Sequence, residues 1–136
     1  MITITGIDHI VLRTTKLEAM LFFYSTILGC PVERQTDAKV GLTQLRAGNA
    51  LIDIVTVASE LGALGGGAPT KTNNNVDHFC LQIAAITEAD LIAYLKSHQI
   101  AVDDFSLRYG AQGYGNSIYI NDPEGNTVEL KCEIPA

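Results

Sequence analysis

The sequence has 136 residues, of which 47% are hydrophobic and 18% are charged, a composition that supports a packed core and excludes an intrinsically disordered chain. Nine Lys and Arg residues against 15 Asp and Glu residues give a formal net charge of −6, which argues against general binding to nucleic acid or to anionic membranes, because both need a basic surface. No apolar run reaches the roughly 20 residues that a transmembrane helix requires.

The first half of the sequence predicts a strand, a helix and three further strands. A strand over 7–12 is followed by Thr15-Lys16-Leu17-Glu18, which has the spacing of a helical capping box. Apolar residues then recur at helical spacing until Gly29, which is a plausible stop. Three short strand-like stretches follow at 32–34, 40–47 and 50–57.

The segment 61–75 contains the runs Gly65-Gly66-Gly67 and Asn73-Asn74-Asn75. This composition predicts a flexible linker between two modules. The glycine triplet is not followed by the Lys and Ser or Thr of a phosphate-binding loop, so we expect no nucleotide site there.

The second half predicts the same order of elements. A strand over 76–81 leads to a shorter helix that begins at Thr87-Glu88-Ala89-Asp90. Strands are expected at 102–107, 117–121 and 127–131. Asp122-Pro123-Glu124-Gly125, between the last two strands, has the composition of a turn.

The sequence contains Cys30, Cys80 and Cys132, an odd number without CxxC spacing. This pattern does not favour a disulfide framework or a zinc ribbon. The first residues also lack the charged and long apolar regions of a secretion signal. We therefore expect a cytoplasmic protein.

The two halves echo each other at both ends. Ile7-Asp8-His9 reappears as Val76-Asp77-His78, and the apolar strand that contains Asp53 resembles the one that contains Glu129. Such internal repetition predicts two structurally similar modules.

Two histidines and two carboxylates therefore occupy matched strand positions: His9, Asp53, His78 and Glu129. If the modules pack with pseudo-two-fold symmetry, the four side chains converge in one cleft. Imidazole nitrogen and carboxylate oxygen suit Zn²⁺, Ni²⁺, Fe²⁺, Co²⁺ or Mn²⁺. The alternative is a symmetry inherited without a metal. The third histidine, His98, is expected at the surface near the end of the second helix.

These residues resemble the vicinal oxygen chelate superfamily, which includes glyoxalase I, fosfomycin-resistance transferases, bleomycin-binding proteins, extradiol dioxygenases and methylmalonyl-CoA epimerase. The resemblance covers essentially the whole chain. It rests on Ile7-Asp8-His9, on Leu21-Phe22-Phe23-Tyr24 running to Leu28-Gly29, on Val76-Asp77-His78, and on the run from Tyr119 through Asp122-Pro123-Glu124-Gly125 to Leu130.

The resemblance implies an α+β fold in which two βαβββ modules form a curved eight-stranded mixed sheet around a metal-binding cleft. Residues 1–136 would form one domain, with modules at 1–60 and 76–136 joined by the linker 61–75. Related proteins with one pair of modules per chain are usually homodimers, and their site often takes one module from each subunit.

By the same resemblance, a divalent metal is held by His9, Asp53, His78 and Glu129. Asp53 stands where glyoxalase I normally has Glu. The transferase and dioxygenase branches bind metal through only two histidines and one glutamate, which here are His9, His78 and Glu129. The ligand role of Asp53 therefore separates two interpretations of the site.

The activity that the resemblance implies is a metal-dependent glyoxalase-like lyase or isomerase, which acts on a small oxygen-chelating substrate through an enediolate. Glu129 is then the first choice as catalytic base and Asp53 the second. Arg13 would hold a carboxylate of a glutathione or other thiol adduct, or else be an arginine at the solvent-facing edge. Tyr119 would line the substrate pocket, or else simply pack there.

Two other activities stay open at this point. One is an Fe²⁺ ring-cleaving dioxygenase or a thiol transferase, with the three-ligand metal set. The other is a non-catalytic dimer that sequesters a small molecule such as an antibiotic. We expect a small-molecule partner in each case.

Overall fold

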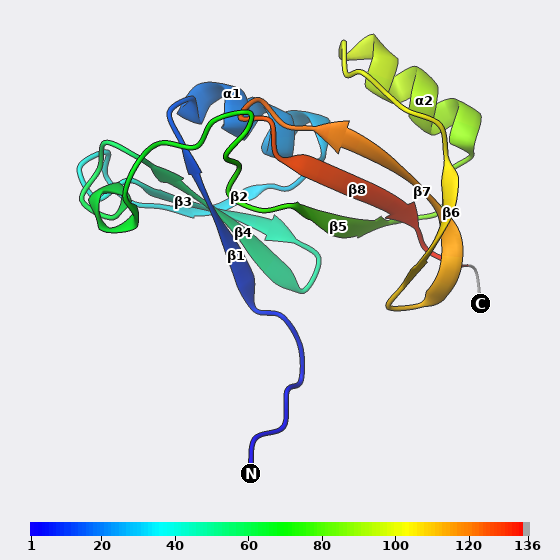
Figure 1. The fold of residues 1–136 in the computed structure, drawn as a ribbon, viewed down its shortest axis with the longest axis horizontal. Helices are drawn as coiled ribbons and strands as arrows, with labels where there is room; N and C mark the ends of the chain where they lie inside the picture. The colour runs from blue at the N-terminus through cyan, green and yellow to red at the C-terminus, as the bar shows by residue number, and fades with distance from the viewer. Residues whose placement is uncertain (135–136) are drawn as a thin grey trace. The chain divides into compact units, whose positions relative to one another are not determined.

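The computed structural model describes residues 1–134, so the last two residues of the expected second module lie outside the described residues. The chain folds into two compact units that divide between Asn75 and Val76. Each unit contains one four-stranded mixed sheet and one main helical segment (Figure 1). Across residues 1–134, no helix is long and apolar enough to cross a membrane.

The first unit has the order strand, helix, three strands. Its elements are β1 (His9–Thr14), α1 (Leu17–Leu21), a π-helical continuation of α1 (Phe22–Ile27), β2 (Val32–Gln35), β3 (Leu42–Ala47), β4 (Ala50–Thr56) and a short 3-10 helix (Gly62–Gly65). The strand order in the sheet is β1-β4-β3-β2. Strand β1 runs parallel to β4, and the other pairs are antiparallel.

The second unit repeats this arrangement with β5 (His78–Ile83), α2 (Glu88–Ser97), β6 (Ser106–Gly110), β7 (Gly113–Asn121) and β8 (Thr127–Cys132). The strand order is β5-β8-β7-β6, and β5 is parallel to β8. Two βαβββ units with mixed sheets are the predicted fold class, which is thereby confirmed. The eight strands form two sheets of four.

One face of each sheet is apolar and buried. In the first unit Leu12, Ile52 and Ile54 are at most 2% exposed, and α1 lies against β4. In the second unit the buried strand residues are Ile118, Ile120, Val128 and Leu130. Because alternate residues of a strand face opposite sides, burial of these residues turns the intervening ones, which include His9 and His78, to the other face.

The first helix differs from the prediction at its start. The residue before the first helical turn is Lys16 rather than the expected Thr15, and the Lys16 side chain makes no capping hydrogen bond. The hydroxyl of Thr14, at the end of β1, accepts a hydrogen bond from the N–H of Lys16 at 2.8 Å. Gly29 ends the helical segment as predicted, with φ of 75°, a conformation that glycine adopts at low cost.

The second helix begins as predicted, whereas the strand after it is displaced. The hydroxyl of Thr87 accepts a hydrogen bond from the N–H of Asp90 at 3.1 Å. The strand expected at 102–107 is found at Ser106–Gly110. A hairpin pairs Gly110 with Gly113 and so sets Ser106 opposite Ser117, and apolar alternation alone does not locate that hairpin.

The segment 61–75, expected as a linker, belongs by its contacts to the first unit. Arg13 holds it on β1, because its guanidinium donates at 2.6–2.9 Å to the backbone carbonyls of Gly62, Gly66 and Gly67. Asn75 also pairs with the backbone of Arg13, accepting from its N–H and donating to its carbonyl. Both ends of the segment are therefore tied to the same strand residue.

The turn before β8 is organised by one buried carboxylate. Asp122 accepts hydrogen bonds from the N–H groups of Glu124 and Asn126 at 3.0 and 2.9 Å, and from the side-chain amide of Asn126 at 2.8 Å. Gly125 completes the turn with φ of 90° and donates to the carbonyl of Asp122. The predicted turn is thus confirmed, and it positions the strand that carries Glu129.

Replacing Asp122 by Ala is expected to lower the free energy of unfolding by about 3 kcal/mol, because three hydrogen bonds to a buried carboxylate are lost. Urea denaturation followed by circular dichroism measures the change. The matched control is Asp103→Ala, which removes an exposed carboxylate and is expected to stay within about 0.5 kcal/mol. Equal stability of the two variants would contradict the role of Asp122.

Replacing Gly65 by Ala is expected to destabilise the first unit by about 1–3 kcal/mol through overpacking. A Cβ at this position would lie 2.4 Å from Nε of Arg13, and Arg13 cannot move aside without releasing the carbonyls that it binds. Thermal melting and the rate of proteolysis within 61–75 report the effect. The control is Gly67→Ala, whose Cβ meets nothing within 4 Å; if both variants are cut at the wild-type rate, the anchoring role of Arg13 is wrong.

Candidate functional site

The first unit brings together two of the four predicted metal ligands, His9 and Asp53. The parallel pairing of β1 with β4 sets Val11 opposite Asp53, and His9 lies two residues earlier on the same face. Nε2 of His9 is 4.0 Å from Oδ2 of Asp53, whose side chain is only 6% exposed. Nδ1 of His9 lies 2.6 Å from Oδ1 of Asp8. We call His9 and Asp53 the first pair.

The second unit brings together the other two predicted ligands in the same way. Strand pairing sets Cys80 opposite Glu129, and His78 lies two residues before Cys80. Nε2 of His78 is 3.6 Å from Oε1 of Glu129, whose side chain is 8% exposed. Nδ1 of His78 lies 2.6 Å from Oδ2 of Asp77. His78 and Glu129 form the second pair, with the register of the first.

The aspartate before each histidine determines which ring nitrogen carries the proton. A carboxylate only accepts hydrogen bonds, so the nitrogen 2.6 Å away must donate, and Nδ1–H faces the carboxylate of Asp8 or Asp77. In neutral imidazole this leaves the lone pair on Nε2, beside the buried carboxylate. The hydrogen bond with Asp8 raises the pKa of His9, and the nearby charge of Asp53 raises it further.

This donor set fits a divalent metal ion. Neutral imidazole nitrogens whose other N–H is held by a carboxylate are the usual form of metal-binding histidine. Two ligands about 2.1 Å from one ion stand roughly 3.0–3.6 Å apart, which is close to the 3.6 and 4.0 Å between the donors of the two pairs. Within residues 1–134, however, no three His, Cys, Asp or Glu side chains are grouped to hold an ion. Each pair supplies two donors.

The carboxylate of Asp53 is oriented by residues that the sequence analysis missed. Nε2 of Gln44, opposite Asp53 on β3, donates to both carboxylate oxygens at 3.2 Å. Nη1 of Arg34 donates in turn to Oε1 of Gln44 at 3.0 Å. The only signal for Gln44 is its place on the polar face of β3, which becomes informative once the register with β4 is known.

Tyr119 lies beside the second pair. It is opposite Glu129 in the pairing of β7 with β8, and its ring meets that of His78 edge to face, with 5.5 Å between centroids. The guanidinium of Arg108, which the sequence analysis also missed, lies over the Tyr119 ring at 4.0 Å from its centroid. The expectation that Tyr119 lines a substrate pocket stays a prediction.

Cys80 shares the polar face with Glu129 but is poorly suited to act as a nucleophile. Partial burial of the thiol and the nearby charge of Glu129 raise the pKa of Cys80 to about 11. Since the thiolate is the reactive form, Cys80 is a neutral thiol near neutral pH.

Two other residues considered from the sequence lie outside both pairs. Arg13 binds the backbone carbonyls of the 61–75 segment through Nη1 and Nη2, so its guanidinium has a structural role in the first unit, and its binding of a substrate carboxylate stays a prediction. His98 is the cap residue directly after α2, with its ring packed against Tyr94 at 4.9 Å between centroids.

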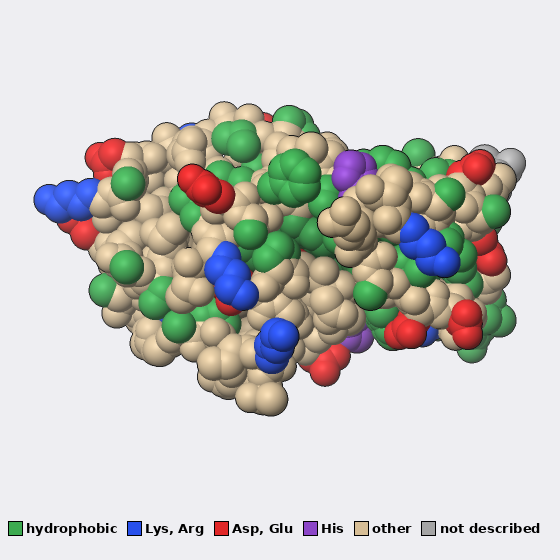
Figure 2. All heavy atoms as spheres, turned by 90° about the horizontal axis from the view of Figure 1, so that it is seen from above, with side chains coloured by type: hydrophobic (Ala, Val, Ile, Leu, Met, Phe, Trp, Pro, Cys, Tyr) green, Lys and Arg blue, Asp and Glu red, His purple; other side chains and the backbone are tan. Residues whose placement is uncertain are grey.

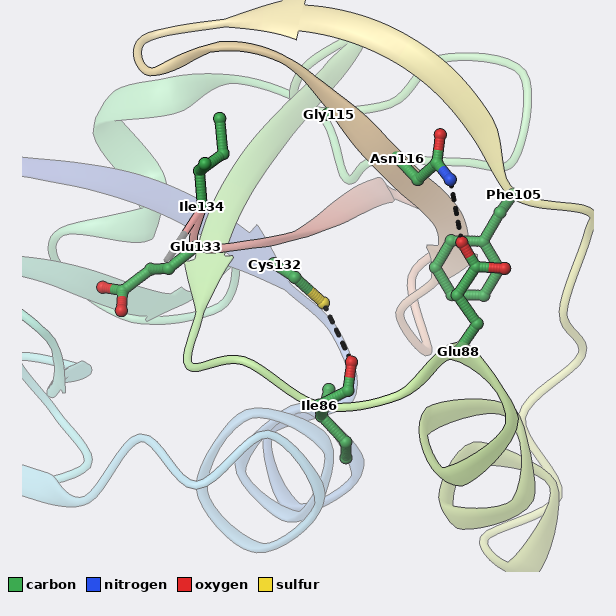
Figure 3. Close-up of a pocket in the computed structure, with 8 residues that line it drawn as sticks. All are labelled: Ile86, Glu88, Phe105, Gly115, Asn116, Cys132, Glu133 and Ile134. Carbon is green, nitrogen blue, oxygen red and sulfur yellow. Dashed lines mark hydrogen bonds between the residues drawn. The ribbon is translucent and has the colours of Figure 1, made fainter. Parts of the chain in front are cut away.

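A cavity of about 230 Å³ in the second unit lies apart from these residues (Figure 3). Ile86, Phe105 and Ile134 supply apolar walls, and the amide of Asn116 donates to the carboxylate of Glu88 at 2.9 Å. None of the predicted site residues lines it. The candidate residues thus lie on the polar face of each sheet and outside this cavity.

Comparison with known proteins places this geometry in context. Among curated proteins, biphenyl-2,3-diol 1,2-dioxygenase 3 of Rhodococcus globerulus is 31% identical over 127 residues, which cover 92% of this chain and 62% of that protein. Catechol-2,3-dioxygenase of Bacillus subtilis is 26% identical over 132 residues, which cover 96% of this chain and 42% of that protein. The chain thus spans about half the length of these curated relatives.

The fold is also that of a solved lyase structure. Lactoylglutathione lyase from Agrobacterium tumefaciens matches with a TM-score of 0.68 at 19% identity, over 96% of this chain and 95% of that one. The family model described as the Glyoxalase/Bleomycin resistance protein/Dioxygenase superfamily matches residues 6–130. Together with the two βαβββ units, this match establishes that the chain belongs to the glyoxalase/bleomycin resistance protein/dioxygenase superfamily.

Proposed function

We propose that the protein is a metal-dependent lyase or isomerase of the glyoxalase type, in which His9, Asp53, His78 and Glu129 hold one divalent ion. The observation that carries this proposal is the match between the two pairs. Asp53 stands beside His9 as Glu129 stands beside His78, with the same register and the same carboxylate contact at Nδ1. Asp53 is also buried and oriented by Gln44 beside His9, as a fourth ligand would need to be.

The ion, when bound, supplies a Lewis acid that stabilises negative charge on two adjacent oxygens of a substrate. The residues of the chain move the proton. A carboxylate takes a proton from one carbon, the C–H electron pair shifts toward the neighbouring carbonyl oxygen, and the proton returns to the adjacent carbon. The reaction is an internal rearrangement that needs no external oxidant or reductant. Glu129 is the first choice for this base, and Asp53 is the second.

The surroundings of Glu129 support its role as the base. Its carboxylate is largely withdrawn from water, so solvent does not compete for the transferred proton. Tyr119 packs on His78, which is consistent with its proposed place in the lining of the substrate pocket.

A ring-cleaving Fe²⁺ dioxygenase is a second candidate, because both curated relatives described above are named dioxygenases. In this chain it would use His9, His78 and Glu129, a facial set of two imidazoles and one carboxylate that suits non-haem iron. Asp53 would then lie outside the metal sphere. The two candidates therefore differ in what Asp53 does.

We also propose that the protein acts as a homodimer in the cytoplasm. Large apolar side chains are exposed in the first unit, including Phe22 at 55% and Leu64 at 84%, and hydrophobic side chains reach the surface in several places on the face drawn in Figure 2. Large exposed apolar side chains such as these are candidates for contact with a second copy.

With Ni²⁺ or Zn²⁺ supplied, the protein is expected to convert the adduct of methylglyoxal and glutathione to its thioester. The absorbance of the thioester measures this reaction.

His78→Ala and Asp53→Ala are each expected to weaken binding of Ni²⁺ by more than about 100-fold, because a residue that binds the ion directly contributes more to affinity than a residue that only orients such a ligand. Gln44→Ala, which removes only the group orienting Asp53, is expected to weaken it about 10- to 100-fold. Isothermal titration with Ni²⁺ measures these affinities.

The matched control is His98→Ala, which removes a histidine outside both pairs and is expected to bind Ni²⁺ as the wild type does. Full retention of Ni²⁺ by Asp53→Ala would reject the four-ligand site. If the Fe²⁺-loaded protein cleaves catechol and neither the Ni²⁺-loaded nor the Zn²⁺-loaded protein forms the thioester, the proposed lyase activity is wrong and the dioxygenase activity takes its place.

A further inference from the structure

Arg108 is a cation held beside the second pair without an acidic partner. Its guanidinium carbon lies 4.0 Å from the centre of the Tyr119 ring, and that ring contacts the imidazole of His78 at 5.5 Å. Arg108 is half-buried, and in the described part of the chain no Asp or Glu forms an ion pair with it. Arg46, by contrast, is bound by both carboxylate oxygens of Glu33.

The position of this guanidinium is set from two sides. Nη1 donates to the carbonyl and to the hydroxyl of Ser117, at 2.8 and 2.9 Å. The buried ammonium of Lys131, on β8, donates at 2.8 Å to the carbonyls of Arg108 and Gly113 in the hairpin of β6 and β7. A Cβ at Gly110 would lie 2.8 Å from Nζ of Lys131, so the absence of a side chain there leaves room for this contact.

These contacts leave one edge of the guanidinium available. The N–H groups of Nη1 point to Ser117, and the ring of Tyr119 covers one face. Nε and Nη2, which lie side by side along the other edge, have no hydrogen-bond acceptor among residues 1–134 beyond the contacts given above. Two adjacent N–H donors in one plane match the two oxygens of a carboxylate.

The local charge at Arg108 is less negative than that of the chain as a whole. The chain has a net charge of −6, which disfavours the approach of anionic ligands. Arg108 and Lys131 place two positive charges on the face that carries Glu129, since Ser117 pairs with Lys131 and Tyr119 with Glu129 on neighbouring strands. These two cations balance the carboxylates of Glu129 and of Asp77, which contacts His78, so an anion meets less repulsion here than the net charge of the chain implies.

We propose that Arg108 binds a carboxylate of the substrate, so that the site selects small oxygen-chelating molecules that carry a separate carboxylate. This inference rests on the proposed function for the position of the chelating oxygens, at the His78 and Glu129 pair. The carboxylate then sits one aromatic ring away from that pair, on the guanidinium edge beside Tyr119. Arg108 is thereby a residue that determines substrate specificity.

Two chelating probes test this inference: acetohydroxamate, and succinomonohydroxamate, which adds a carboxylate to the same chelating group. The Ni²⁺-loaded wild type is expected to bind the carboxylated probe about 10-fold more tightly than acetohydroxamate, because one hydrogen-bonded pair of opposite charges contributes about this much to affinity. Arg108→Met is expected to reduce this preference to less than about 2-fold, and Arg108→Lys to keep part of it. Arg46→Met, the matched control, is expected to keep all of it. Isothermal titration measures the affinity of each of the four proteins for both probes.

A second measurement tests whether Arg108 binds a carboxylate in the absence of a metal ion. In the metal-free protein, titration with succinate is expected to shift the Nε–H resonance of Arg108, identified by its loss in Arg108→Met, and to leave that of Arg46 in place. A wild type that shows neither the shift nor the preference would overturn the inference, even if Ni²⁺ binds and the lyase is active. Failure of Ni²⁺ binding alone would overturn the proposed metal site, and the succinate shift would still decide the role of Arg108.

Discussion

The parallel pairing of the first and last strands of each unit is the constraint on which the candidate site depends. β1 beside β4 and β5 beside β8 have one register, in which the residue two positions after the histidine stands opposite the acid. A shift by one residue would turn every side chain of the strand to the other face. The apolar faces prevent such a shift, because Leu12, Ile54 and Leu130 are buried and would be exposed by it.

Burial then prepares each carboxylate for a cation. Asp53 and Glu129 are largely withdrawn from water, and an isolated buried carboxylate is costly unless it is paired or coordinates a metal. Each has an imidazole nitrogen within 4.0 Å, whose tautomer is set by the aspartate that precedes the histidine. Asp53 is further oriented by Gln44, and Glu129 shares its face with Lys131 and Arg108.

Much of the fold followed from local patterns in the sequence. The repeated Asp-His strand and the acid near the end of each half predicted the two modules, and Gly29, Thr87 and the turn at Asp122 act as their local chemistry indicated. Contacts between distant segments did not follow in the same way. Arg13 binds a segment about 50 residues later in the sequence. The contacts of Gln44 with Asp53 and of Arg108 with Tyr119 depend on how neighbouring strands pair, which the sequence around each residue does not indicate. The displaced β6 has the same cause, since the hairpin rather than its own composition determines where it starts.

The central claim is that one ion takes an imidazole from each unit, and the Nδ1–H groups held by Asp8 and Asp77 offer a direct measurement. In the Co²⁺-loaded protein, proton NMR is expected to show two exchangeable, paramagnetically shifted imidazole N–H signals, because metal-bound histidines with the other N–H held by a carboxylate exchange that proton slowly. His9→Ala should remove one signal and His78→Ala the other. A single such signal with one Co²⁺ bound per chain, or two signals that both survive in His9→Ala, would contradict a site built from both pairs.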